Sequence, residues 1–308
     1  MESSKDALPS WHEGEAKQSI IDFVRRVTSP DSEFFVPEQE RIATFDNDGT
    51  LWVEKPVLAQ LAFYKRELLD QDVLKNKGTL SRLIHLGMSI IWDAFDLFKK
   101  LLAYLHSGLT TEEYRQKVTD WIAKARHPRY ERLYTELAYL PMLELLAYLE
   151  QHGFRNYIVS GGTANFIRPW SNRVYRISAD RIIGSSVKTR LAERDNGLVV
   201  MLEPIPFFFD YRSGKVLGIE RALAKRPIAA FGNSIGDVEM LRWADGSECA
   251  LCMLIHHTDA EREYKYKPDP FYHLGKKTLT WAKELDWQVV DMKQDWKRMF
   301  HFEQEGDS

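Results

Sequence analysis

The sequence predicts an α/β fold, in which a doubly wound parallel sheet is interrupted by one helical insertion. Short apolar and β-branched runs alternate with stretches of helical periodicity over most of the 308 residues. That alternation is typical of a parallel sheet covered by helices. Between residues 52 and 139 the periodicity is almost wholly helical, which indicates a helical domain inserted between two strands of the sheet.

Composition and charge exclude several classes of protein. The apolar content of 44% suits a folded core, and the net charge of −3 gives no reason to expect a nucleic-acid or membrane partner. The two cysteines, Cys249 and Cys252, are too few for a disulfide scaffold and lie in an apolar run that predicts a buried strand. The longest apolar-rich stretch, 83–105, contains two aspartates and two lysines, too many charges for a membrane span.

The N-terminal 15 residues are polar and lack the apolar segment of a secretory signal. We therefore expect a cytoplasmic protein. An exported protein whose leader had been removed would begin in the same way, so that alternative stays open.

The first strand ends in two carboxylates. A helix over 14–28 and a polar loop precede Ile42–Phe45, an apolar run that predicts a buried strand. Asp46 and Asp48 follow it directly, and Gly49-Thr50 turns the chain. Buried carboxylates need a cation or hydrogen-bond donors, and ligands of open α/β sheets bind at this end of the strands. For this segment alone, an acidic turn without function is the alternative.

Three helices are expected in the insertion. The first starts at Pro56 and runs through Leu69, the second covers 80–105, and the third covers 111–125. Thr110 and Glu113 form a capping-box pattern ahead of the third helix.

The α/β alternation resumes at residue 142 and continues to the C-terminal part. The first expected elements are a helix over 142–152, a strand over 156–159 that runs into Ser160-Gly161-Gly162-Thr163, and a helix from Ala164. A short strand over 181–183 and a hairpin over 195–210 follow, and then a helix from Gly214-Lys215 to about Ala224. The last elements are a strand over 227–231, a loop over 232–237, a helix from Val238, the cysteine-bearing strand over 249–255 and a helix near 277–285.

Polar and small residues stand at three of these strand ends and at one helix start: Asp46/Asp48, Ser160-Gly161, Asn233/Asp237 and Lys215. If the sheet is parallel, the three strand ends meet at one edge. Carboxylate and amide oxygens suit a hard cation, whereas a hydroxyl, backbone N–H groups and a lysine suit an anion. Mg²⁺ facing a phosphate fits this set of groups. A P-loop site is not indicated, because the chain lacks the Gly-x-x-x-x-Gly-Lys-Ser/Thr pattern.

The sequence resembles the haloacid dehalogenase-like superfamily in its phosphoserine-phosphatase-like branch. The first motif of the family, Asp-x-Asp-Gly-Thr, is matched by 46–50, and the second, a strand that ends in Ser or Thr, by Ser160. The third, a lysine, is best matched by Lys215, and the fourth, an acidic loop, by 232–237. Four motifs in order cover nearly the whole chain.

The resemblance implies a Rossmann-like core at 1–51 and 140–308 and a helical cap at 52–139. It implies Mg²⁺-dependent hydrolysis of a small phosphomonoester, with Asp46 as the nucleophile that forms an aspartyl-phosphate. Asp48 would protonate the leaving oxygen and then activate water. Dehalogenases of the superfamily lack this second acid, so its presence favours phosphate chemistry.

The resemblance also implies the binding groups. Mg²⁺ would be held by the side chain of Asp46, the carbonyl oxygen of Asp48, and the fourth-motif residues Asn233 and Asp237. Ser160, the backbone N–H groups at Gly161, and Lys215 would neutralise the phosphoryl oxygens. Many relatives carry Asp where this chain has Asn233. An amide oxygen can still bind Mg²⁺, but it adds no charge.

Other polar residues carry weaker expectations. Lys188 rivals Lys215 for the lysine role, but Lys215 fits better by position. Trp52 and Glu54 follow the acidic turn; they are substrate contacts or, equally well, a packing residue and a solvated charge. His256 and His257, which Asp259 follows, are expected to lie on the surface or to support the site rather than to share a metal. Arg168, Arg173 and Arg176 form a basic cluster that is expected on the surface, with substrate binding as the alternative.

Two alternatives to hydrolysis stay open. The first is phosphoryl transfer to another hydroxyl, as in mutase-like relatives. The second is a binding module built on an inactive core, for which Asn233 argues weakly and the Asp46/Asp48 pair argues against. The identity of the substrate and the oligomeric state cannot be read from the sequence, because no motif fixes the residues of the cap.

Overall fold

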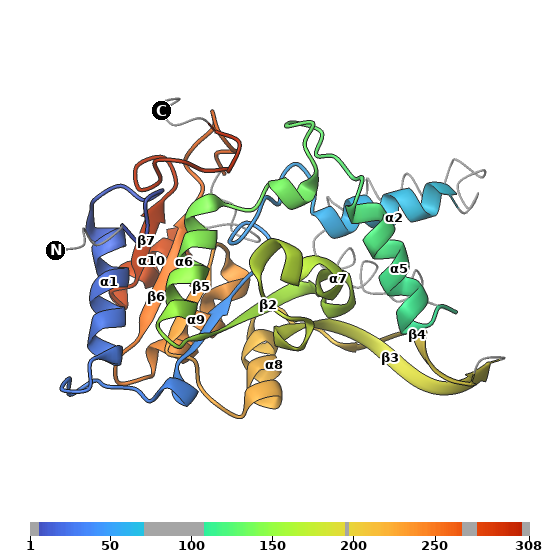
Figure 1. Cartoon of the computed structure of the whole chain (residues 1–308), viewed down its shortest axis with the longest axis horizontal. Coiled ribbons are helices and arrows are strands. Elements are labelled where there is room, and N and C mark those ends of the chain that lie inside the picture. Colours follow the sequence, from blue (N-terminus) through green and yellow to red (C-terminus); the bar gives the residue numbers. More distant parts are fainter. Residues whose placement is uncertain (1–5, 71–107, 195–196, 267–275, 304–308) are drawn as a thin grey trace.

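The computed structural model of this chain describes residues 6–70, 108–194, 197–266 and 276–303. Seven strands form one sheet in the order β4-β3-β2-β1-β5-β6-β7 (Figure 1). Their bounds are β1 (Ile42–Phe45), β2 (Arg155–Thr163), β3 (Ile182–Arg194), β4 (Gly197–Phe208), β5 (Ala229–Gly232), β6 (Leu251–His256) and β7 (Gln288–Asp291). All neighbours are parallel except β3 and β4, which confirms the predicted doubly wound parallel sheet.

Helices cover both faces of this sheet. The first face packs against α1 (Glu15–Thr28), α6 (Leu140–Gln151) and α7 (Ala164–Tyr175). The second packs against α8 (Ser213–Leu223), α9 (Val238–Asp245) and α10 (Lys276–Glu284). Successive strand residues point to opposite faces, so Ile158 joins the first core and Val159 the second.

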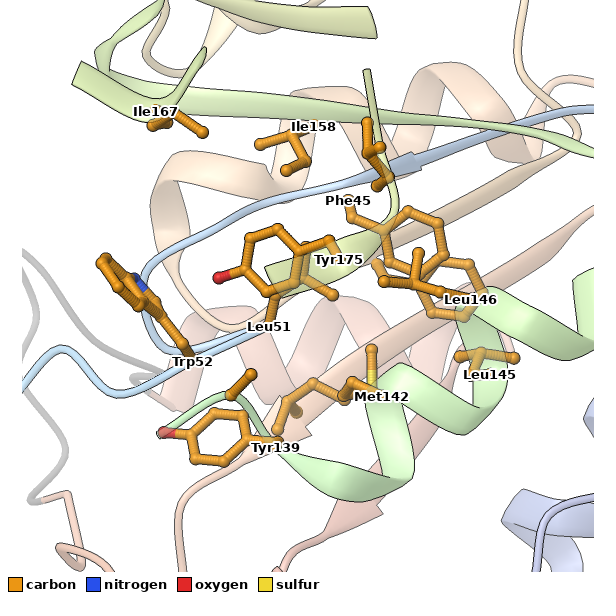
Figure 2. Packing of buried hydrophobic residues seen from close by; sticks show 14 of the residues in the cluster. Phe45, Leu51, Trp52, Tyr139, Met142, Leu145, Leu146, Ile158, Ile167 and Tyr175 are labelled. Atoms are coloured by element: carbon orange, nitrogen blue, oxygen red, sulfur yellow. The ribbon is translucent and has the colours of Figure 1, made fainter. Parts of the chain in front are cut away.

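The strand β1 lies at the centre of the sheet, and its four residues are all buried. It pairs with β2 on one side and β5 on the other. The Phe45 ring stacks on Phe231 of β5, with ring centroids 4.4 Å apart. Figure 2 shows Phe45 with Leu145 and Leu146 of α6 in the first core, and Leu51 and Trp52 beyond it. The residues that follow β1 are therefore attached to the most enclosed part of the sheet.

The described part of the helical insertion contains α2 (Ala59–Asp70) and α5 (Thr111–Ile122), which lie together beyond α7 in Figure 1. The capping box at Thr110 and Glu113 is present. The first helix begins at Ala59 rather than Pro56, and its first turn is anchored by Gln60, which bonds to Thr163 of β2. The helix expected over 80–105 lies outside the described residues. The domain boundaries remain a prediction.

The largest departure from the expected elements is the ribbon of β3 and β4. A short strand over 181–183 and a hairpin over 195–210 were expected, whereas β3 runs from Ile182 to Arg194 and pairs with β4 from Ser186 onward. The strand continues past the parallel sheet because β4 supplies the partner for its backbone. Leu191 and Leu198 of this ribbon are exposed.

The edge of the sheet formed by β6 and β7, near the C-terminus of the chain, also differs from expectation. The strand β7 was not expected, and it pairs in parallel with β6. The strand β6 begins at Leu251, so it includes Cys252 but not Cys249, and both cysteines are free. Among the described residues, no helix combines the length and apolar character that crossing a membrane requires.

Candidate active site

The turn after β1 is tight and depends on glycine. The carbonyl of Asn47 accepts hydrogen bonds from the N–H groups of Leu51 (2.9 Å) and Trp52 (3.3 Å). Gly49 adopts a φ of +78°, and a Cβ there would lie 2.0 Å from Nδ2 of Asn233. Only glycine meets both conditions without strain. The tight turn brings Asp46 and Asp48 to the edge of the sheet where β2 and β5 also end.

Lys215 joins the first and fourth motifs. It lies in the first turn of α8, it is 1% exposed, and its Nζ donates to Asp46 Oδ1 at 2.5 Å and to Asp237 Oδ1 at 2.6 Å. A third bond runs from Nζ to the carbonyl of Val159 on β2 at 2.8 Å. The ammonium group thus uses all three of its donors, on β2, on the turn after β1 and on the loop after β5.

Asp237 organises the loop after β5. Its Oδ2 accepts hydrogen bonds from the backbone N–H groups of Asn233 (3.0 Å) and Ser234 (2.9 Å) and from the hydroxyl of Ser234. The side-chain amide of Asn233 donates to Glu54 Oε1 at 3.1 Å. Glu54 is 6% exposed, so it is a buried carboxyl group and not the solvated charge that the sequence allowed.

Asp48 is held by an indole. It is half-buried, and its Oδ1 accepts a hydrogen bond from Trp52 Nε1 at 2.9 Å. Trp52 is fully buried and stacks on Trp170 of α7, with ring centroids 4.4 Å apart. In this state Trp52 therefore positions Asp48 and presents no exposed surface to a substrate.

The end of β2 lies close to Asp48. Ser160 is fully buried, and its Oγ accepts the N–H of Gly162 at 3.0 Å. A Cβ on Gly162 would lie 3.9 Å from Asp48 Oδ2 and 2.9 Å from Gln60 Oε1, so the backbone passes close to both side chains. Gln60 fixes this segment by accepting the N–H of Thr163 at 2.9 Å and donating to its hydroxyl at 2.6 Å.

Burial dominates the electrostatics of these acids. It raises the pKa of Asp46 to about 8, helped by the charge of Asp237 and opposed by Lys215. Burial also raises the pKa of Asp48, against the hydrogen bond from Trp52, and places the pKa of Glu54 well above its usual range. Burial disfavours the charged form of Lys215, but Asp237 and Asp46 outweigh this and raise its pKa.

These groups suit a hard cation. The carboxyl groups of Asp46 and Asp237 share the ammonium group of Lys215, Asp48 follows Asp46 two residues on, and Glu54 bonds to Asn233 of the same loop as Asp237. This surplus of oxygen donors and negative charge, together with the amide oxygen of Asn233, is a donor set that Mg²⁺ accepts. No cluster of three or more His, Cys, Asp and Glu side chains arranged to hold a metal is found among the described residues.

The weaker candidates lie elsewhere. Lys188 is exposed on β3. Arg168 donates to the carbonyls of Ala179 and Ile182 and so supports the chain after α7. Asp259 pairs with Arg262 at 2.6 Å. His257 is buried and contacts Gly49 in the turn after β1, which is closer to the site than a surface histidine would be.

Two contributors to the site were not foreseen. Gln60 tethers α2 to the end of β2, and Tyr175 of α7 donates its hydroxyl hydrogen to Asn47 Oδ1 at 3.1 Å. Both side chains lie within helical patterns that read as ordinary amphipathic segments. Neither residue carries a local sequence signal, and the burial of Gln60, which is 7% exposed, is visible only in the structure.

Comparison with known proteins identifies a family to which this sequence is similar. A protein-family model described as haloacid dehalogenase-like hydrolase matches residues 43–242. No curated protein matches the sequence.

Several solved structures are similar. A conserved protein of unknown function from Anaerococcus prevotii DSM 20548 is 18% identical, with a TM-score of 0.52, over 79% of this chain and 86% of that one. A protein of unknown function from Bordetella pertussis Tohama I is 16% identical, with a TM-score of 0.50, over 82% and 99%. A phosphoserine phosphohydrolase-like protein from Francisella tularensis subsp. tularensis SCHU S4 is 14% identical, with a TM-score of 0.43, over 83% and 95%. At these identities the first two show a shared fold.

Proposed function

This chain belongs to the haloacid dehalogenase-like hydrolase family, and from that membership and the geometry of the site we propose that it is a Mg²⁺-dependent phosphatase. Its substrate would be a small phosphomonoester, hydrolysed through an aspartyl-phosphate on Asp46. The observation that carries the proposal is the buried group of Asp46, Lys215 and Asp237, with the second acid Asp48 two residues after the first.

In the first step, a carboxylate oxygen of Asp46 attacks phosphorus. Lys215 holds Oδ1, so we assign the attack to Oδ2. The bond between phosphorus and the leaving oxygen breaks, and that oxygen takes a proton from Asp48. Burial raises the pKa of Asp48, which suits a group that must carry a proton at this stage. The alcohol leaves with the proton, and the phosphoryl group stays on Asp46.

In the second step, Asp48 acts as a base. Its carboxylate takes a proton from water while the water oxygen attacks phosphorus, and the bond to Asp46 breaks. Phosphate leaves, Asp46 is again a carboxylate, and Asp48 is again protonated. The hydrogen bond from Trp52 keeps Oδ1 of Asp48 in place, so Oδ2 is the oxygen we assign to proton transfer.

The phosphoryl oxygens would be bound by the ends of β2 and α8. Ser160 and the backbone N–H groups near Gly161 would supply donors, and the ammonium group of Lys215, whose three hydrogens are already bonded, would supply positive charge. Positioning and charge stabilisation are most of what phosphoryl transfer requires. Gln60 supports this function indirectly, because it fixes the backbone at Thr163 immediately after the donors.

Mg²⁺, when bound, would offset negative charge on the phosphoryl group and on the carboxylates. The side chain of Asp46, the carbonyl oxygen of Asp48 and the residues Asn233 and Asp237 would hold it. Asn233 lacks the charge that many relatives have at this position. Glu54 is hydrogen-bonded to it at 3.1 Å, and we assign to Glu54 the carboxylate that compensates for the amide.

The helical residues of 52–139 are proposed to form a cap that sets the substrate and excludes water. In the described part, α2 reaches the site through Gln60 and α5 packs against α7.

The experiment measures phosphate released from a generic aryl phosphate, with Mg²⁺ and with chelator, for the wild type and Asp46→Asn. We expect release that needs both Mg²⁺ and Asp46, with the variant as well folded as the wild type. Activity in folded Asp46→Asn would refute the mechanism. Transfer of phosphate to an added alcohol, without free phosphate, would indicate a phosphotransferase instead.

A further inference from the structure

A second polar cluster contacts the turn after β1, which carries Asp46 and Asp48. His257 follows β6 directly and is 1% exposed. Its Nε2 lies 2.7 Å from the carbonyl oxygen of Gly49, the residue after Asp48. Its Nδ1 lies 3.0 Å from Oε2 of Glu263, which is fully buried. Neither residue contacts the proposed phosphate site directly, and the mechanism above does not use them.

The hydrogen-bond partners determine where the protons are. A carbonyl oxygen only accepts, so the hydrogen on Nε2 of His257 points at Gly49. One further proton lies between Nδ1 and Glu263, and whichever atom carries it, the pair is neutral. His257 and Glu263 can therefore hold the turn without adding charge to a site that already has a surplus of carboxylates.

The pair is itself firmly supported. The ring of Tyr266 stacks on His257 with centroids 3.8 Å apart and an angle of 5°. Oε2 of Glu263 also accepts the N–H of Tyr264 at 2.6 Å. Arg129, from the segment after α5, donates to the carbonyl of Glu263 and to that of Glu261 at 2.7 Å. Packing and hydrogen bonds thus restrict both rings and the loop that carries them.

We propose that His257 and Glu263 are positioning residues for the catalytic turn. His257 fixes the direction of the Gly49 carbonyl, and this fixes the peptide units on which Asp48 and the turn depend. The inference rests on the proposed function only for its effect on turnover. The placement of the turn by His257 is a separate claim, with its own measurement.

Two variants of His257 separate the two contacts. His257→Gln places an amide N–H near the position of Nε2, so it keeps the bond to Gly49 and loses the one to Glu263. His257→Asn places its amide near Nδ1, so it keeps Glu263 and loses Gly49. Both remove the ring from its stack on Tyr266, so each variant controls for the packing loss in the other.

The first readout is amide hydrogen exchange of the turn, where the N–H of Gly49 bonds to the carbonyl of Trp52 at 2.8 Å. We expect about fivefold faster exchange in His257→Asn, as for loss of one hydrogen bond, and little change in His257→Gln. The second readout is hydrolysis of the aryl phosphate. We expect kcat to fall by about 100-fold in His257→Asn with KM unchanged, and the glutamine variant to recover most of it.

Equal exchange and equal kcat in the two folded variants would overturn the proposal. If the wild type does not hydrolyse phosphate esters, the proposed function fails, and hydrogen exchange still decides the placement claim. If neither variant folds, ¹⁵N NMR of the wild-type imidazole decides it. A protected hydrogen on Nε2 supports the bond to Gly49, and a ring with its only hydrogen on Nδ1 overturns it.

Discussion

Two buried polar clusters meet at the turn after β1, and they differ in charge balance. Around Lys215, two carboxyl groups share one ammonium group, and burial raises the pKa of Asp46 to about 8. Around His257, one carboxyl group faces one imidazole across 3.0 Å, and the pair is neutral. The first cluster has more carboxyl groups than cations, which is why we propose that it binds Mg²⁺. The second is complete in itself and so suits support.

The largest effect on the first cluster is expected from removal of the ammonium group that Asp46 and Asp237 share. Lys215→Met leaves Asp46 and Asp237 facing each other without a counter-charge. We expect loss of phosphate release and destabilisation by about 3–5 kcal/mol, as for a buried ion pair that loses one partner. Urea unfolding measures the second effect. Lys188→Met, at the exposed rival lysine, is the control and should change neither, so an unstable Lys188→Met with a stable Lys215→Met would reverse the assignment.

Asp210 is a further acid whose charge acts on Lys215, and it can be neutralised without changing Asp46, Asp48 or Asp237. It is fully buried, and burial raises its pKa to about 7, opposed by the charges of Lys215 and Arg221. A raised pKa means that the folded state holds the proton more tightly than the unfolded state. The contribution of Asp210 to stability is therefore most favourable below about pH 4 and is lost as the pH rises through about 7.

Asp210→Asn should accordingly stabilise the protein at pH 8 by up to about 4 kcal/mol, at about 1.4 kcal/mol per pKa unit. At pH 4 the variant should gain nothing. Thermal unfolding at the two pH values measures the difference. A gain that is the same at both values would mean that the titration of Asp210 has no part in it.

The hydrogen bond between Asn233 and Glu54 allows a test of whether Glu54 supplies the negative charge that Asn233 lacks. Glu54→Gln should weaken Mg²⁺ binding by about 10–100-fold, the range for groups that orient or balance metal ligands. Asn233→Asp in the same chain should restore most of the loss, because the carboxylate returns at the neighbouring position. Calorimetric titration of Mg²⁺ into the two single variants and the double variant measures this. If the double variant binds Mg²⁺ no more tightly than Glu54→Gln, the carboxylate of Glu54 does not compensate for the amide of Asn233.

The smallest effect is expected in the neutral cluster. Glu263→Gln keeps the size of the side chain and can still donate a hydrogen to Nδ1 of His257. It gives up one acceptor oxygen, so we expect a cost of about 1 kcal/mol. Urea unfolding of Glu263→Gln and Lys215→Met under the same conditions compares their free energies of unfolding directly. A loss as large as that of Lys215→Met would show that the cluster at His257 carries a net charge after all.

The sequence was most informative where chemistry and topology coincide. Asp46, Ser160 and Asn233 each follow an apolar run, and parallel pairing brings such strand ends to one edge of the sheet. Their convergence therefore follows from the alternation of strands and helices alone. Lys215 was identified by its place at a helix start, and the structure puts its Nζ between two carboxylates.

The partners of these residues could not be predicted, because they come from distant parts of the chain. His257 reaches Gly49 across 208 positions, and Glu54 reaches Asn233 across 179. No periodicity encodes such pairs. The length of β3 was underestimated for a related reason: its outer half is stabilised by β4, and an exposed ribbon lacks the apolar alternation that marks a strand.

The most direct test of the central claim is to look for the phosphoryl group on Asp46 during turnover. Rapid quenching with borohydride reduces an acyl phosphate to the alcohol, so Asp46 would become homoserine in the peptide that carries it. We predict that mass spectrometry finds this conversion at Asp46, only with substrate and Mg²⁺ present. Turnover without any modification of Asp46, or with the modification at another residue, would contradict the account.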